Sequence, residues 1–165
     1  MEYHALEPRQ LRTAFSRFAT GVTVVSYDFE GEPRGVTVNS FTSVSLDPAL
    51  ALVSIGKHAA TAGRLAAGRF AINVLSEHQR AHALQFSGRH QAGLDIEWNR
   101  AVGLAPWLSG TVAVYQCASW RIIEAGDHDL HIGEVQSVST DSNRKPLLFL
   151  DGKFITAGQD MLAAV

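Results

Sequence analysis

Apolar residues occur along this chain mostly in short blocks, separated by turn-forming Gly, Pro, Asn and Asp residues. Near the N-terminus, Leu11, Phe15 and Phe18 are spaced as on one face of a helix, which is predicted to begin after Pro8 and to end near Gly21. Most later blocks are rich in β-branched or aromatic residues, which is typical of strands. The predicted strands cover residues 22–27, 36–38, 50–55, 70–75, 111–124, 130–138 and 147–154.

Two further short helices are predicted between these strands. One is the Ala-rich stretch 59–67. The other begins at a capping box of Ser76 and Gln79 and runs to about Phe86, after which residues 89–108 show no regular pattern. Because regular helices do not separate the strands, the pattern favours a mainly β, mostly antiparallel barrel with three short peripheral helices over a doubly wound parallel sheet.

One polar run interrupts the apolar pattern, from Thr37 to Ser45. Five of its nine side chains carry hydroxyls and one carries an amide, yet apolar segments flank it on both sides. Burying such a group without a partner costs about 1–3 kcal/mol, so these groups need partners. The run is either a Ser/Thr-rich turn that satisfies itself through local side-chain to backbone bonds, or the border of a flat heteroaromatic ligand with donors and acceptors along its edge.

Composition narrows the class of protein. The 165 residues fit a single domain over residues 1–165, and 14 basic residues stand against 16 acidic ones, a net charge of −2 without a basic run. Nucleic acid and anionic membrane surfaces are therefore not expected partners. No apolar stretch is long enough to span a bilayer, and the N-terminus lacks a secretory pattern. Cys117 is the only cysteine, so a reducing, cytoplasmic location is expected.

Several chemistries leave no signature in the sequence. No Gly-x-Gly-x-x-Gly follows a strand, and neither a Walker motif nor a Gly-x-Ser-x-Gly elbow occurs. Asp127 and His128 are adjacent, which on a strand would direct them to opposite faces, so a hydrolase triad is not expected. His78 and His82 share a helix face by their spacing but lack a third metal ligand nearby, so a solvated face is the preferred interpretation. Cys117 is expected to be a buried, inert thiol.

Five blocks of the sequence, in this order, resemble a known family. They are residues 18–25 (FATGVTVV), 37–48 (TVNSFTSVSLDP), 70–76 (FAINVLS), 86–88 (FSG) and 126–128 (GDH), the last followed by Ile132-Gly133-Glu134-Val135. The chain resembles the flavin reductase-like family, whose fold is the FMN-binding split β-barrel, a mostly antiparallel and Greek-key-like barrel. The resemblance implies a homodimer that transfers hydride from NADH or NADPH to FMN or FAD. It also implies a separate flavin-dependent monooxygenase that receives the reduced flavin.

The resemblance further implies roles for individual residues. Thr37, Val38, Asn39 and Ser40 would border the isoalloxazine ring, largely through backbone groups, and Ser43, Val44 and Ser45 would continue that wall. Lys57 and Thr61 would contact the ribityl phosphate, at the N-terminus of the helix predicted from Ala59. Phe86 would close the pocket near the ring. His128 would position the nicotinamide rather than carry protons, so no acid or base is assigned.

Two alternatives share the same barrel. One is a non-catalytic flavin-binding protein that carries electrons or stores flavin. The other is an enzyme like pyridoxamine-phosphate oxidase, which would need several basic residues around a second phosphate, whereas only Lys57 and scattered arginines are present. Because the fold alone does not select among these activities, assays must separate them.

Overall fold

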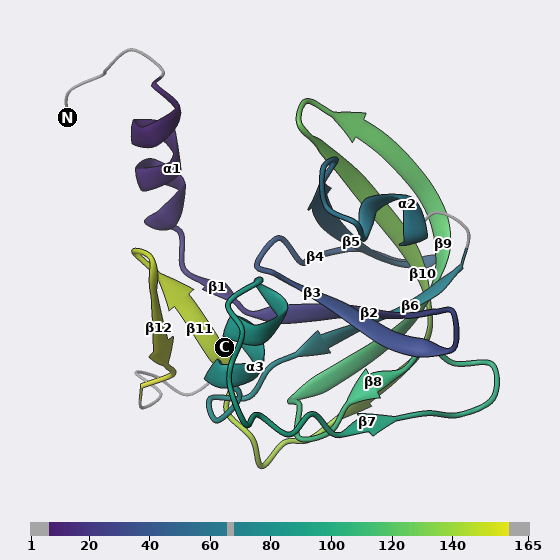
Figure 1. Ribbon diagram of the computed structural model, residues 1–165. Helices are drawn as coiled ribbons and strands as arrows, with labels where there is room; N and C mark the ends of the chain where they lie inside the picture. Colours follow the sequence, from purple (N-terminus) through teal and green to yellow (C-terminus); the bar gives the residue numbers. More distant parts are fainter. Residues whose placement is uncertain (1–6, 66–67, 159–165) are drawn as a thin grey trace.

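The computed structural model describes residues 7–65 and 68–158 of the chain, and its main feature is a curled antiparallel sheet (Figure 1). The strand order in this sheet is β3-β2-β6-β9-β10-β5-β4, and every neighbouring pair is antiparallel. The bounds of the strands are β2 Thr23–Phe29, β3 Glu32–Val38, β4 Thr42–Leu46, β5 Ala49–Gly56, β6 Arg69–Val74, β9 Ala113–Ala125 and β10 His128–Thr140. The predicted mainly β, split-barrel fold is confirmed.

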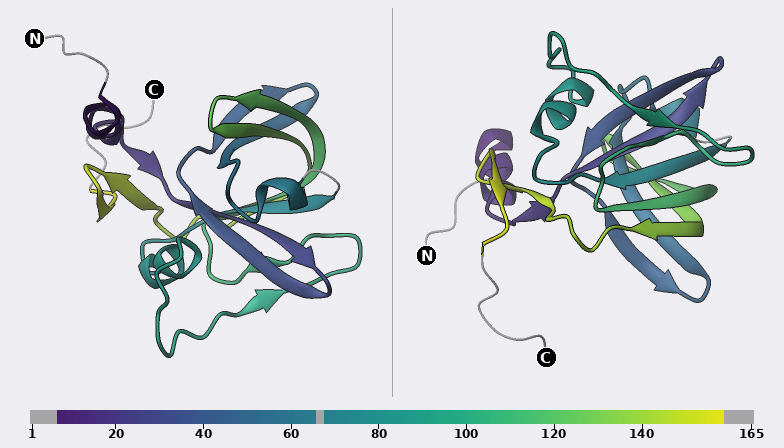
Figure 2. Two further views of the ribbon diagram at one scale, coloured as in Figure 1. Left: turned by 45° about the horizontal axis from the view of Figure 1, so that its top comes forward. Right: turned by 90° about the horizontal axis from the view of Figure 1, so that it is seen from below.

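The two edges of this sheet are consecutive in the chain. β3 and β4 lie at opposite ends of the strand order, yet only residues 39–41 connect them. Such a short connection requires the sheet to curl until its edges approach each other, and Figure 2 shows this curvature. The polar run Thr37–Ser45 therefore spans the seam of the barrel, where edge strands have backbone groups without a neighbouring strand.

The interior of the barrel is filled by the apolar face of each strand. Val25 and Tyr27 of β2, Val53 and Ile55 of β5, and Phe70 of β6 are all buried there. This agrees with the β-branched blocks of the sequence, which place alternate side chains on one face. None of the helices among residues 7–65 and 68–158 is both long and apolar enough to cross a membrane.

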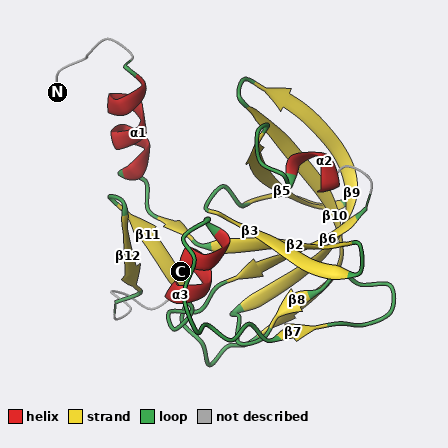
Figure 3. Cartoon of the chain, in the orientation of Figure 1, coloured by secondary structure: helices red, strands yellow, loops and turns green. Residues whose placement is uncertain are grey.

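The helices are few and peripheral (Figure 3). α1 (Pro8–Ser16) begins where predicted but ends before Gly21, because the chain turns into the short strand β1 (Thr20–Gly21). Its apolar residues are not buried: Phe15 is 70% exposed, and Phe18, just beyond the helix, is 76% exposed. The helix stands away from the barrel, as Figure 1 shows, so no other part of the described chain covers this apolar face.

The other two helices are shorter than predicted. α2 covers only Ala62–Leu65; turns occupy residues 57–61, and residues 66–67 lie outside the described residues. α3 (Arg80–Phe86) begins after the predicted capping box. Its Gln79 side chain accepts a hydrogen bond from the Ser76 N–H (3.0 Å), but this contact closes the turn before the helix rather than its first turn.

One predicted strand proves to be a hairpin. The segment predicted over 147–154 divides into β11 (Leu147–Leu150) and β12 (Lys153–Thr156), and these form a second sheet with β1. The turn between them has positive φ at Asp151 and Gly152, which is typical of an Asp-Gly hairpin.

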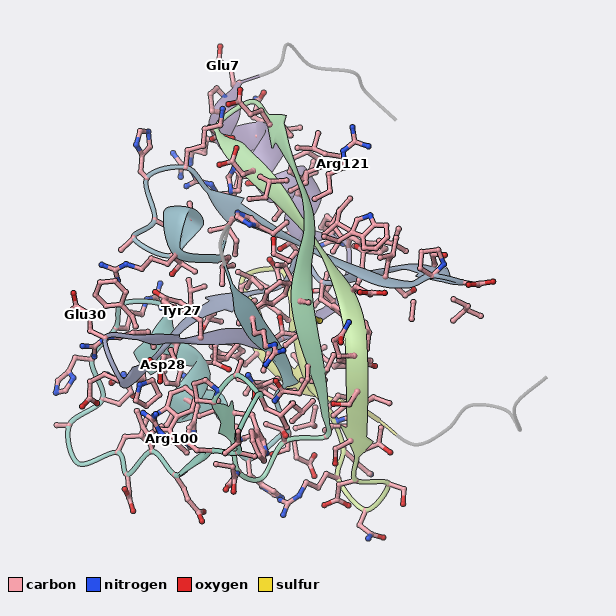
Figure 4. The ribbon with its side chains drawn as sticks, turned by 90° about the vertical axis from the view of Figure 1, so that its right-hand side faces the viewer. Glu7, Tyr27, Asp28, Glu30, Arg100 and Arg121 are labelled. Carbon is pink, nitrogen blue, oxygen red and sulfur yellow. The ribbon has the colours of Figure 1, made fainter. Side chains whose placement is uncertain are left out.

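The segment predicted to be irregular, 89–108, contains only two short paired strands, β7 (Trp98–Asn99) and β8 (Trp107–Leu108). Arg100 anchors it by donating to Asp28 (3.0 Å) and to the Gly31 carbonyl (2.8 Å) of the β2–β3 turn. Figure 4 shows Asp28 and Arg100 at the same end of the molecule.

Candidate functional site

A cavity of about 270 Å³ opens at the seam of the barrel, and we refer to it as the shelf pocket. One wall is the end of β3 and the residues after it, and the other comes from the end of β5, the turn beyond it and the start of β10. Its lining residues are Val36, Thr37, Val38, Asn39, Ser40, Ser54, Ile55, Gly56, Ala59 and His128. The structure thus brings together five of the residues predicted to contact the ligands, namely Thr37, Val38, Asn39, Ser40 and His128.

The Thr37 and Ser40 hydroxyls of the polar run bond to the backbone of other elements instead of pointing freely into the shelf pocket. The Thr37 hydroxyl donates to the Ala83 carbonyl of α3 at 2.7 Å. The Ser40 hydroxyl donates to the Ser54 carbonyl (3.0 Å) and accepts from the Ser54 N–H (2.9 Å). Because β3 is an edge strand, its outer backbone groups and the exposed Asn39 side chain are left to meet a ligand. The Thr37 and Ser40 hydroxyls are therefore satisfied by backbone groups distant in sequence, not by the local bonds of a Ser/Thr-rich turn. The role of the run as the border of a ligand stays a prediction.

The remaining part of the run lies elsewhere. Ser43, Val44 and Ser45 belong to β4, which pairs with β5 and has a register irregularity between Ser43 and Ser45. None of the three lines the shelf pocket, and Val44 is 47% exposed. Their role in continuing the flavin wall stays a prediction.

The predicted phosphate contacts differ from the sequence interpretation in their surroundings. The helix expected from Ala59 begins at Ala62 and has four residues, so it offers no extended N-terminal dipole to an anion. Thr61 is buried, and its hydroxyl lies 3.3 Å from the hydroxyl of Tyr27. Lys57 lies beside Gly56 of the shelf pocket, with its ammonium 3.6 Å from Glu124 and 3.9 Å from Asp129. A turn therefore stands where the N-terminal N–H groups of a helix were expected to meet the phosphate. Lys57 also already has acidic partners.

Phe86 packs on the outer side of β3. Its ring meets Trp98 edge-on with centroids 5.6 Å apart, and it lies under Gly35, where a Cβ atom would come within 3.1 Å of the ring. It does not line the shelf pocket.

On that same outer side, a second cavity of about 220 Å³ shares Thr37, Val38 and Asn39 with the shelf pocket. We call it the α3 groove. Its other lining residues are Val22, Ala83, Leu84, Ser87, Arg89, Phe149, Gly152 and Phe154. Asn39 therefore lies between the shelf pocket and the α3 groove.

His128 and Asp127 are in direct contact. Asp127 lies in the β9–β10 turn, so the two side chains are not held on opposite faces as they would be within a strand, and the His128 Nδ1 and Asp127 Oδ1 are 2.7 Å apart. This hydrogen bond, and then the charge of the imidazole, lower the pKa of the Asp127 carboxyl. With Nδ1 engaged by Asp127, Nε2 is the nitrogen near Gly56 in the shelf pocket.

Sequence reasoning missed Ser54 and Gly56 of the shelf pocket, and Arg89, Phe149 and Phe154 of the α3 groove. Ser54 and Gly56 sit at the end of an ordinary apolar strand, and only the curl of the sheet brings them to the shelf. Arg89, Phe149 and Phe154 are joined by the packing of α3 against the second sheet. No local motif marks any of them.

The other candidate reactive groups behave as structural residues. Burial raises the pKa of the Cys117 thiol to about 12, in agreement with an inert thiol. No group of three or more His, Cys, Asp or Glu side chains able to hold a metal occurs in the described part of the chain. His78 precedes α3 and is exposed, so it does not share a helical face with His82.

His131 is a buried histidine whose two ring nitrogens have no hydrogen-bond partner among the described residues. Burial lowers the pKa of its imidazole, although Asp129 partly opposes this. The folded chain therefore keeps it neutral, while the unfolded chain takes up a proton near the ordinary pKa of 6.5. Stability from this group is complete above about pH 6.5 and is lost as the pH falls toward the lower folded-state pKa.

We expect His131→Phe to make the acid-side loss of stability shallower, because phenylalanine cannot take up the proton. The measurement is the free energy of urea unfolding at several values between about pH 7 and about pH 5. His90→Phe, at an exposed position, is the matched control and should keep the wild-type slope. Equal slopes for His131→Phe and wild type would contradict this assignment.

Comparison with known proteins leads to the same family that the sequence blocks resemble. A family model described as a flavin reductase like domain matches residues 15–158. A probable flavin reductase of Rhizobium meliloti is 42% identical over 174 aligned positions, which cover the whole of this chain and 55% of that protein. The chain thus spans about half the length of this relative.

Two other relatives are matched over more of their length. An NADH-dependent FAD reductase of Streptomyces globisporus is 42% identical over 153 residues, which cover 88% of this chain and 83% of that protein. The reductase subunit HsaB of a flavin-dependent monooxygenase from Rhodococcus jostii is 33% identical over 154 residues, which cover 91% of this chain and 78% of that protein.

Solved structures agree with the fold. The flavin reductase PheA2 superposes with a TM-score of 0.88 at 35% identity, covering 93% of this chain and all of that one. The NADH:FAD oxidoreductase SgcE6 of Streptomyces globisporus, solved in complex with NAD and FAD fragments, gives a TM-score of 0.86 at 39% identity, covering 96% of this chain and 99% of that one. The chain therefore belongs to the flavin reductase-like family.

Proposed function

We propose that this protein is an NAD(P)H-dependent flavin reductase that supplies reduced FMN or FAD to a separate monooxygenase. The observation that carries the proposal is the shelf pocket, where the edge backbone of β3 faces Gly56 and His128 across an open cavity. Relatives named as an NADH-dependent FAD reductase and as a monooxygenase reductase subunit support the catalytic reading over a flavin carrier or store.

The residues of the shelf pocket fit the rim of a flavin. Backbone N–H and C=O groups at the end of β3 offer donors and acceptors in one row, and the Asn39 side chain adds one of each. Gly56, on the opposite wall, has no side chain and so leaves room for a flat ring. A bound flavin supplies the acceptor for the hydride of NADH or NADPH. The task left to the protein is to hold the two rings in contact, at about 3–3.5 Å between reacting atoms.

His128 is placed to position the nicotinamide. Its ring is half exposed at the mouth of the shelf pocket, and Asp127 holds it by Nδ1. No Rossmann motif occurs in the sequence, so NADH or NADPH binds folded over the flavin on this open surface. Hydride transfer needs no proton from the chain, which agrees with a positioning role.

The assembly we propose is a homodimer. Large apolar side chains are exposed on α1 and just after it, on the edge strand β4 and on the β9–β10 hairpin, and a second copy of the chain would bury them. These side chains are Phe15, Phe18, Val44, Leu46, Trp120 and Ile123.

We place the protein in the cytoplasm, because its lone cysteine is a buried thiol and NADH is available there. We also treat residues 1–165 as a single domain.

The test is oxidation of NADH and of NADPH, followed at 340 nm, with riboflavin, FMN or FAD as acceptor. Turnover with free flavin is expected. A protein that binds flavin but shows no turnover is a carrier or store, and this result would overturn the proposal. A protein that oxidises pyridoxamine phosphate instead belongs to the second alternative.

Replacing His128 with alanine is expected to raise the KM for NADH several-fold while flavin affinity changes little, because we assign its ring to the nicotinamide and not to the flavin. Steady-state kinetics at saturating flavin and a separate flavin titration measure the two effects. His90→Ala, at an exposed position away from the shelf pocket, serves as control. An unchanged KM for NADH would remove His128 from this role.

A further inference from the structure

Lys57 follows Gly56, a lining residue of the shelf pocket, and its ammonium lies near two acidic side chains. Its ammonium is 3.6 Å from Glu124 Oε2 and 3.9 Å from Asp129 Oδ1. Its backbone N–H donates to the Asp127 carbonyl at 3.0 Å, which ties the end of β5 to the β9–β10 turn. Two carboxylates and one backbone carbonyl from one hairpin thus contact Lys57.

The two acidic partners of Lys57 differ in how firmly they are held. Asp129 on β10 pairs with Ile55 across the sheet, its side chain is 21% exposed, and its Oδ1 is buried without a hydrogen bond to any described residue. Glu124, near the end of β9, is 85% exposed. Lys57 itself is 34% exposed, so its charge is shared between a mostly buried carboxylate and an exposed one.

We propose that Glu124 and Asp129 are built-in counter-ions of Lys57 that oppose the phosphate of a bound flavin. The inference rests on the proposed function, and it concerns how strongly FMN and FAD are favoured over riboflavin at the same pocket. A phosphate that approaches Lys57 must displace Glu124 or share the lysine with it, and it also meets the negative charge of both acids within the screening length of about 10 Å at 0.1 M salt. The ring edge therefore carries most of the affinity, and the phosphate adds little.

This arrangement suits a reductase whose product must leave. Tight binding of the phosphate by an unpaired lysine would slow release of reduced FMN. A lysine that is already neutralised by Glu124 and Asp129 binds the phosphate more weakly, so release is faster. Glu124 and Asp129 thus set specificity and release without touching the reacting ring.

The main test compares the Kd values of FMN and riboflavin for wild type and Glu124→Gln in low-salt buffer, by quenching of flavin fluorescence. We expect FMN to bind about two- to fivefold more tightly to the variant, the range typical of one exposed charge pair, with riboflavin unchanged. The gain should shrink in 0.5 M NaCl because added salt screens the charges. Glu32→Gln, at the far end of β3, makes the same change in net charge and should leave both Kd values unchanged.

Two further variants separate the explanations. Asp129→Asn should act in the same direction as Glu124→Gln, with riboflavin binding as the check that its barrel is intact. In a Lys57→Gln background the effect of Glu124→Gln should diminish, because the counter-ion then has no lysine to neutralise.

The outcomes are distinct. An unchanged or weaker FMN affinity in Glu124→Gln, an equal gain in Glu32→Gln, or an undiminished gain in the Lys57→Gln background would overturn the counter-ion role. If wild type binds neither riboflavin nor FMN, the proposed function itself fails. Riboflavin binding with unchanged FMN preference across the acid variants would refute this inference alone.

Discussion

Replacing Gly133 with valine is expected to lower the free energy of unfolding by about 3 kcal/mol, the upper part of the usual range for overpacking. A Cβ atom at Gly133 would lie 2.5 Å from Cζ of Phe70 and 2.8 Å from Cβ of Cys117. Both of those residues are buried, at 1% and 2% exposure, so neither can turn toward solvent. Gly133 pairs with Ser119 of β9 on one side and with Ala51 of β5 on the other, so its backbone cannot move away without breaking part of the ladder.

The midpoint and slope of urea unfolding, followed by circular dichroism, measure this effect. Gly21→Val is the matched control, because a Cβ atom there meets nothing within 4 Å and the residue also lies in a strand. Phe70→Leu in the Gly133→Val background should restore part of the lost stability, since it removes the closest atom. A Gly133→Val protein as stable as Gly21→Val would show that this contact does not limit the fold.

Gly133 also illustrates what sequence patterns can and cannot predict. The β-branched and aromatic blocks predicted the strands of the barrel, because alternation and branching are local properties. The need for glycine at 133 arises from Phe70 and Cys117, which only the folded sheet brings next to it. The sequence around Gly133 therefore contributes to the family resemblance without revealing why a glycine is needed there. In the same way, the Ala-rich stretch 59–67 predicted from propensity a helix from Ala59, but the chain forms turns over residues 57–61, where Thr61 contacts Tyr27, and α2 starts only at Ala62.

The candidate site shows the same division. The polar run and the family resemblance assigned Thr37–Ser40 to the flavin ring and His128 to the nicotinamide, and the structure places these residues around one cavity. The sequence could not reveal that the Thr37 and Ser40 hydroxyls fix the end of β3 and the residue after Asn39 to other elements. Their partners on α3 and β5 come close only when the sheet curls. The acidic partners of Lys57 were missed for the same reason.

Ser40→Ala is expected to weaken flavin binding by about tenfold and to lower the free energy of unfolding by about 1–3 kcal/mol. The Ser40 hydroxyl makes two hydrogen bonds to the Ser54 backbone, at 3.0 Å to its carbonyl and 2.9 Å from its N–H. Each bond of this kind contributes about 0.5–1.5 kcal/mol, and a tenfold change in Kd corresponds to about 1.4 kcal/mol. The substitution frees residues 39–41, and the edge of β3 must then be ordered again each time a ligand binds.

Titration of riboflavin fluorescence gives the Kd, and riboflavin is chosen because it has no phosphate to interact with Lys57. Ser142→Ala, at an exposed turn serine, is the control and should bind as wild type does. Thermal unfolding of both variants reports stability separately, so a weaker shelf can be distinguished from a partly unfolded protein. A Ser40→Ala protein that loses stability but keeps the wild-type Kd would mean that the seam of the barrel supports the fold without shaping the binding edge.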